Sequence, residues 1–160
     1  MRRLLKFLHS VGAIGLMGGM ACLLVLHEFM PAPDALAEYA RLRAAMGGIA
    51  TWILFPSLAL ALVAGLLAIA ANPAFHNAGW AWAKLATGVL VFEWSLVAII
   101  GPIQEEAELS AHALATRADV LLGASLASER GSLWVMLAVM TANVVLGVWR
   151  PRFTRRQAPP

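Results

Sequence analysis

Long apolar runs alternate with short polar segments along this chain, and their lengths predict membrane-spanning helices. A helix needs about 20 mostly apolar residues to cross the hydrocarbon core of a bilayer. Four runs reach or approach that length: 4–29, 46–71, 80–103 and 133–149. The stretches MPAPD, ANPAFHNAG and GP separate them, and proline and glycine are typical of such breaks. The pattern therefore predicts an all-α fold, an integral membrane four-helix bundle.

The spacing of the runs also predicts how the chain is organised. We expect residues 1–153 to form a single four-span membrane domain and residues 154–160 to form a basic, disordered tail. Residues 31–45 are then a short polar link. Residues 104–131 are the longest connection, in which the acidic stretch QEEAE opens a surface helix.

Composition and charge add a location and an orientation. Hydrophobic residues make up 61% of the chain and charged residues 13%, against about 25% charged in soluble proteins, and the mean hydropathy is +0.75. Basic residues gather at the two ends, in MRRLLK and RPRFTRR, and such clusters mark the cytoplasmic side of a membrane protein. We therefore expect a multi-pass protein of a bacterial-type inner (cytoplasmic) membrane, N-in/C-in, with the lipid bilayer and not nucleic acid as its surroundings.

Three polar side chains on different spans fall at one depth in this topology. His9 enters the first span and Lys84 the third from the cytoplasmic side, and Asn143 approaches the same level along the fourth span. Ionisable residues inside a membrane are costly and usually functional. The sequence therefore predicts a polar site near the cytoplasmic face. Ordinary roles stay open: an interfacial histidine, a lysine anchored at the headgroups, and an asparagine that bonds helix to helix.

Lys84 and Glu93 cannot both face the bundle centre, because nine positions on a helix correspond to about 180°. Either Glu93 faces inward and Lys84 is an anchor, or Lys84 faces inward and Glu93 meets another subunit or stays protonated. Thr87 and Ser95 share the face of Lys84, which favours the second arrangement.

The first span carries a packing motif. Gly15 and Gly19 are four positions apart, a spacing that allows close helix approach. Together with Glu93 they are candidate partner-binding residues. His27, next to Glu28, is interpreted as a hydrated helix end.

Three stretches resemble a superfamily of small membrane bundles. KFLHSVGAIGLMGG is similar to its first helix, GWAWAKL to the third-helix signature of the HemJ type, and VVLGVWRPRF to the close of the fourth helix in uncharacterised relatives. The superfamily includes HemJ-type protoporphyrinogen oxidases and copper-resistance D domains. In the HemJ type the first-helix histidine and third-helix lysine are essential and associated with haem b. The resemblance thus implies that His9 and Lys84 hold that cofactor.

Three functions are compatible with these observations. The first is a haem-b- or porphyrin-binding redox protein, with His9 as metal ligand, Lys84 and Asn143 as further cofactor-binding residues, and Lys84 as the catalytic residue of a protoporphyrinogen-oxidase-like reaction that passes electrons to a quinone. The second is a non-catalytic accessory or scaffold subunit, in a homo-oligomer or a larger membrane complex. The third is copper handling, since imidazoles suit copper. Whether the protein is an enzyme stays open.

Overall fold

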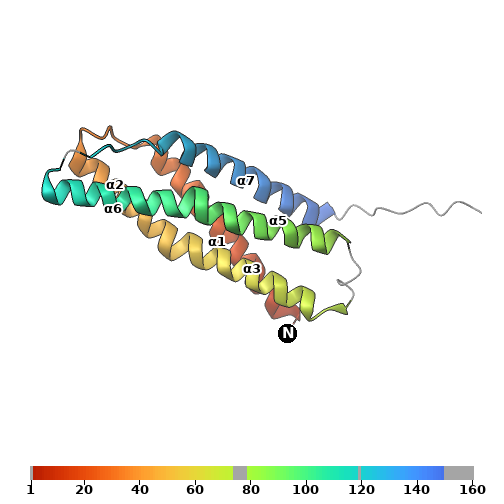
Figure 1. Ribbon diagram of the computed structural model, residues 1–160. Helices are drawn as coiled ribbons and strands as arrows, with labels where there is room; N and C mark the ends of the chain where they lie inside the picture. Colours follow the sequence, from red (N-terminus) through yellow and green to blue (C-terminus); the bar gives the residue numbers. More distant parts are fainter. Residues whose placement is uncertain (1, 74–78, 119, 150–160) are drawn as a thin grey trace, which may run out of the picture.

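The described part of the protein is all-helical. The computed structural model describes residues 2–73, 79–118 and 120–149, and in these residues four helical rods lie along one another (Figure 1). The rods comprise, in chain order, α1 (Arg2–Glu28); α2 (Leu36–Ile49), η1 (Ala50–Leu54) and α3 (Phe55–Ala70); α5 (Gly79–Ser95), η2 (Leu96–Ile100) and α6 (Gly101–Thr116); and α7 (Leu126–Trp149). The start of α1 and the end of α7 lie at the same end of the bundle (Figure 1).

The second and third rods pass through π-helical turns without ending. η1 is followed by Pro56 and η2 by Pro102, each in the first turn of the next α-helical segment. Proline cannot donate its backbone hydrogen bond and clashes with the carbonyl of the preceding turn. A π-helical turn is wider, so the chain accommodates each proline and stays helical. The predicted break at GP is therefore wrong. The predicted link over 31–45 is too long, because α2 already begins at Leu36.

The two long rods exceed what a bilayer requires. Leu36–Ala70 contains 35 residues, or roughly 50 Å at about 1.5 Å per residue, whereas the hydrocarbon core is about 30 Å thick. Three described helices, Arg3–Glu28, Leu36–Ala70 and Ala81–Thr116, are long and apolar enough to cross a membrane. The fourth rod, α7, packs alongside α1, α5 and η2. A fourth span and the N-in/C-in topology stay predictions, and the tail 154–160 lies outside the described residues.

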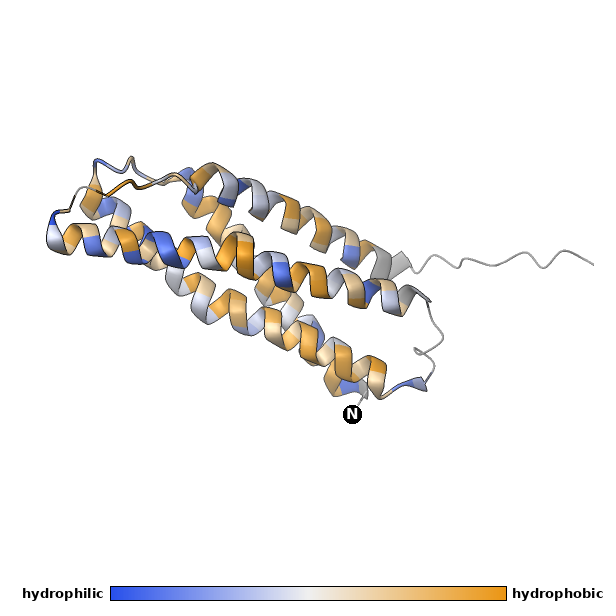
Figure 2. Ribbon diagram, in the orientation of Figure 1, coloured by the Kyte–Doolittle hydropathy of each residue, from blue (hydrophilic) through white to orange (hydrophobic). Residues whose placement is uncertain are grey.

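Apolar side chains from all four rods form the core. Figure 2 shows the hydrophobic colouring along the length of the rods, with polar residues gathered towards the α2–α6 end. Burial from water and close packing hold such an interior together. The core residues include Leu16, Met20, Leu23, Met46, Leu54, Leu58, Ile99, Ile103, Leu133 and Met136. This packed middle separates the two polar regions described below.

The glycine face of α1 packs against the second rod of the same chain. A Cβ added to Gly12 would lie 2.7 Å from both the Ala61 nitrogen and the Ser57 oxygen, and one added to Gly19 would lie 2.8 Å from a leucine side chain of η1. A Cβ on Gly15 would overlap the Ser57 hydroxyl. Gly15 and Gly19 thus pack against α3 and η1 of the same chain, and a partner-binding role for them stays a prediction.

Candidate functional site

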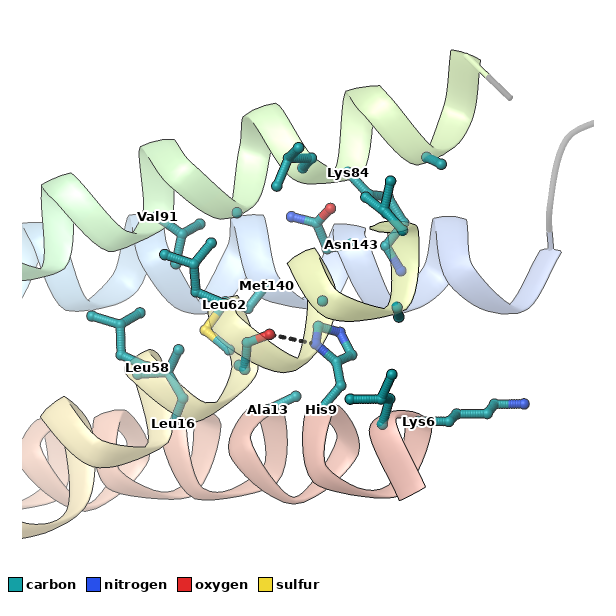
Figure 3. Close-up of a pocket in the computed structure, with 18 of the residues that line it drawn as sticks. Lys6, His9, Ala13, Leu16, Leu58, Leu62, Lys84, Val91, Met140 and Asn143 are labelled. Atoms are coloured by element: carbon teal, nitrogen blue, oxygen red, sulfur yellow. Dashed lines mark hydrogen bonds between the residues drawn. The ribbon is translucent and has the colours of Figure 1, made fainter. Parts of the chain in front are cut away.

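A cavity of about 480 Å³ opens between α1, α3, α5 and α7, at the end of the bundle that holds the start of α1 (Figure 3). Its wall is mostly apolar: α1, α3 and α5 contribute mainly alanine, leucine and glycine residues, and α7 contributes Met140 and Val144. Polar side chains interrupt this wall at five positions: Lys6, His9, Asn72, Lys84 and Asn143. Small-molecule sites typically enclose about 300–1,000 Å³ and combine apolar walls with a few polar groups. The cavity has these properties.

The ring of His9 is held by the backbone of the second rod. Its Nδ1 lies 2.7 Å from the carbonyl oxygen of Ala61 (Figure 3). A carbonyl oxygen only accepts a hydrogen bond, so Nδ1 carries the hydrogen, and in the neutral ring Nε2 then has a lone pair. The described residues give Nε2 no hydrogen bond. A fixed imidazole with an available Nε2 is the arrangement found in histidines that ligate metals.

Lys84 and Glu93 lie on opposite sides of α5, as their spacing requires. The half-buried Lys84 lines the cavity, whereas Glu93 is exposed on the outer surface of the bundle. Of the two arrangements that the sequence left open, the structure therefore has the lysine inside and the glutamate outside.

Asn143 joins two helices at the wall of the cavity. The hydroxyl of Thr87 donates to Oδ1 of Asn143 at 3.0 Å, and Nδ2 of Asn143 donates to the carbonyl of Val139 at 3.2 Å. The reading of Asn143 as a bond between helices is thus confirmed. His9, Lys84 and Asn143 come from three helices and line one cavity, as the depth argument required. Their roles towards a cofactor stay predictions.

A second polar region lies at the other end of the bundle, and sequence reasoning did not find it. Arg43 of α2 is 0% exposed, and its Nη1 lies 2.7 Å from Oε2 of Glu129 on α7. Nε2 of His27 on α1 lies 3.3 Å from the same oxygen. His27 is therefore not a hydrated helix end, as predicted, but a buried contact of a carboxylate. Three rods meet at this one group.

The same region includes a second carboxylate. The hydroxyl of Tyr39 donates to Oε1 of Glu106 at 2.6 Å and receives a hydrogen bond from Nε of Arg43 at 3.2 Å. The backbone nitrogen of Gly123 also donates to Oε1 of Glu106, at 2.6 Å. We call His27, Tyr39, Arg43, Glu106 and Glu129 the ionic cluster. It links all four rods, and only Glu106 comes from the stretch QEEAE that was predicted to lie on the surface.

The ionic cluster makes the stability of the protein depend on pH through Glu129. Burial alone would raise the pKa of this carboxyl, but contacts with His27, Arg43 and Ser125 outweigh it and lower the pKa from 4.5 to about 2. A carboxylate with a lowered folded-state pKa stabilises the fold above its unfolded pKa, and this contribution is lost as the pH falls through the folded value. The contribution is on the order of 3 kcal/mol.

Acidification from pH 4.5 towards pH 2 is accordingly expected to destabilise the wild type more than a Glu129→Gln variant. The amide does not titrate, so the difference between the two proteins isolates Glu129 from the other carboxylates. Unfolding of the detergent-solubilised proteins, measured across this pH range, checks the result. Parallel pH profiles for the two proteins would contradict it.

A metal cage of protein ligands is not found in the described part of the chain. No three His, Cys, Asp or Glu side chains in residues 2–73, 79–118 and 120–149 lie close enough to hold a metal ion together. Haem iron needs fewer protein ligands, because the porphyrin supplies four nitrogens. In comparisons with known proteins, no family model, curated protein or solved structure matches the chain.

Proposed function

We propose that this protein is a small membrane redox protein that binds haem b or a related porphyrin in the cavity lined by His9 and Lys84. The observation that carries the proposal is the hydrogen bond between Nδ1 of His9 and the Ala61 carbonyl, at 2.7 Å. It leaves Nε2 available at the wall of an apolar cavity. The chemistry of these groups fits a haem, since one fixed imidazole and an apolar enclosure are what a haem iron and its macrocycle require.

Each polar residue of the cavity has a distinct task in this proposal. His9 would hold the haem iron through Nε2, and its ring is oriented by the second rod. Lys84 supplies a positive charge that holds a carboxylate of the porphyrin edge, or acts as a second ligand; Asn143 keeps α5 and α7 together at the wall. The apolar side chains exclude water, which strengthens the charge interactions inside. Bound haem supplies one-electron chemistry, and its potential is tuned by ligand identity and burial.

The setting that we propose is a bacterial-type inner membrane with both termini in the cytoplasm. The three long apolar helices support a membrane location, and the common end of α1 and α7 supports termini on one side. The cavity then lies near the cytoplasmic face. Oxidation of a porphyrinogen, with electrons passed to a quinone, is the enzymatic version of the proposal. It is supported by the resemblance of the sequence motifs to the HemJ type.

The first test is an absorption spectrum of the protein purified in detergent from haem-replete cells. We expect a Soret band that is absent in a His9→Ala variant and retained in a His112→Ala variant, because His112 is exposed on α6 and outside the cavity. Titration with added haem b should show a dissociation constant raised about tenfold or more for His9→Ala. A colourless wild-type preparation that also fails to bind added haem would refute the proposal.

A second candidate function, a scaffold subunit, is favoured by the exposed Glu93 on α5. A carboxyl on the outer face of a candidate span is costly in hydrocarbon unless another subunit supplies a hydrogen-bonding partner. Copper handling ranks third, because the described residues provide no group of three ligands for a metal ion. Purification of the protein with its neighbours, with wild type compared to Glu93→Leu, separates the scaffold function from haem binding.

A further inference from the structure

Glu93 lies on the exposed face of a candidate membrane span, where the described residues offer it no counter-charge. It is exposed, belongs to the candidate span Ala81–Thr116, and is flanked by exposed Leu90, Trp94 and Val97. A carboxyl group in hydrocarbon needs a hydrogen-bonding partner, since its burial without one is strongly unfavourable. Among the described residues, none forms a hydrogen bond or an ion pair with Glu93. The described residues therefore leave the hydrogen-bonding capacity of the Glu93 carboxyl open to a group of another molecule.

The residues around Glu93 form a regular helix-pairing pattern. Successive spacings of three and four positions connect five exposed residues, which we call the α5 seam: Ala83, Ala86, Leu90, Glu93 and Val97. This is the spacing of a stripe that packs against another helix at a small crossing angle. The two alanines allow close approach, while Leu90 and Val97, 68% and 76% exposed, supply apolar contact area.

A second copy of this chain that presents the same face offers the Glu93 carboxyl a hydrogen-bonding partner. A copy that presents a different face does not. Within the described residues, the exposed basic side chains lie near the ends of the rods or in a connection, so none is at the depth of Glu93: Arg3, Lys6, His9, Arg41, His112, Arg117 and Arg130. Copies that insert in one orientation pair about a twofold axis along the membrane normal. Each residue near that axis then meets its own counterpart at the same depth.

We propose that the protein forms a parallel homodimer along the α5 seam, in which the two Glu93 carboxyl groups hydrogen-bond to each other. A protonated carboxyl donates and the other carboxyl accepts, so no cation is required. Lys84 and the cavity lie on the opposite side of α5, and each copy keeps its own cavity. The dimer does not depend on haem binding.

Cysteine cross-linking in native membranes tests the geometry of the dimer. The sole cysteine, Cys22, is replaced by alanine in the full-length chain. Leu90→Cys and Val97→Cys place a thiol on the seam, whereas Ile14→Cys and Val63→Cys place one on exposed positions of α1 and α3. We expect the seam variants to form disulfide-linked dimers at least tenfold faster than the control variants. Equal rates, or cross-linking only to a protein of another mass, would overturn the proposal.

Substitution of Glu93 tests its role directly. Glu93→Gln keeps a group that both donates and accepts, and the dimer is expected to persist. Glu93→Leu removes the hydrogen bond, and the dimer dissociation constant is expected to rise about tenfold. Both variants should retain the helical content and unfolding midpoint of the monomer, because Glu93 is exposed. A wild type that is monomeric in bilayers, or a Glu93→Leu variant that dimerises as tightly as wild type, would refute the inference.

Discussion

Replacing Arg43 with alanine is expected to lower the free energy of unfolding by about 3–5 kcal/mol. Arg43 is 0% exposed and pairs with Glu129, whose side chain is 1% exposed. Without the guanidinium, Glu129 keeps a negative charge in a buried site and Tyr39 loses a donor. Removing one partner of a buried ion pair is much more harmful than exchanging both for apolar residues. The loss should appear in unfolding titrations of the detergent-solubilised protein.

The chain contains a matched control for this experiment. Arg130 pairs with Glu28 at 3.4 Å, but both side chains are exposed, and exposed pairs contribute only about 0–1 kcal/mol. Arg130→Ala should therefore change the free energy of unfolding very little. It is a matched control because it also removes an arginine that pairs with a glutamate near the same end of the bundle. A double variant, Arg43→Met with Glu129→Leu, should recover much of the stability lost in Arg43→Ala. Similar losses for Arg43→Ala and Arg130→Ala would show that the ionic cluster contributes little.

Gly12→Ala is expected to separate α1 from α3 and disturb the cavity at the same time. The added methyl group would lie 2.7 Å from two backbone atoms, the Ala61 nitrogen and the Ser57 oxygen, and backbone cannot move aside as a flexible side chain can. Overpacking of this kind costs about 1–3 kcal/mol. Because the Ala61 carbonyl holds the ring of His9, the same displacement should weaken binding at the cavity.

Gly18→Ala is the control, since nothing lies within 4 Å of a Cβ at that position. Both substitutions gain the same helix propensity of about 1 kcal/mol, so the difference between the two variants isolates the clash. Unfolding free energies and haem titrations of both proteins provide the two readouts. If Gly12→Ala is as stable as Gly18→Ala and binds haem equally, the contact between α1 and α3 is looser than the structure indicates.

The bundle and the cavity could be predicted because both depend on simple periodic patterns. Lengths of apolar runs define helices, and the alternating direction of successive spans brings His9, Lys84 and Asn143 to one level. The continuity of the third rod through Gly101 and Pro102 could not be predicted, because proline and glycine usually end helices. A π-helical turn precedes Pro102, as one precedes Pro56, and no composition rule indicates such turns.

The ionic cluster was missed for a different reason: its polar residues point inward where the surrounding sequence is polar. In QEEAE, Glu106 is buried while Glu105 and Glu108 are exposed, and only the Tyr39 hydroxyl and the Gly123 nitrogen distinguish it. Those partners are far away in sequence. One weak signal was present, since Tyr39 and Arg43 are four positions apart, a spacing that places two side chains on one helix face.

The two polar regions lie at opposite ends of the molecule, with consequences for how a flat ligand could enter. His9 and His27 are 18 positions apart on α1, or roughly 27 Å. The ionic cluster links the rods beside His27, whereas the cavity lies between the rods beside His9. Any separation of the helices is therefore restricted at the end that the ionic cluster holds and is greatest at the opposite end, where the cavity lies. A planar ligand of the kind proposed for the cavity would therefore enter at this end of the bundle.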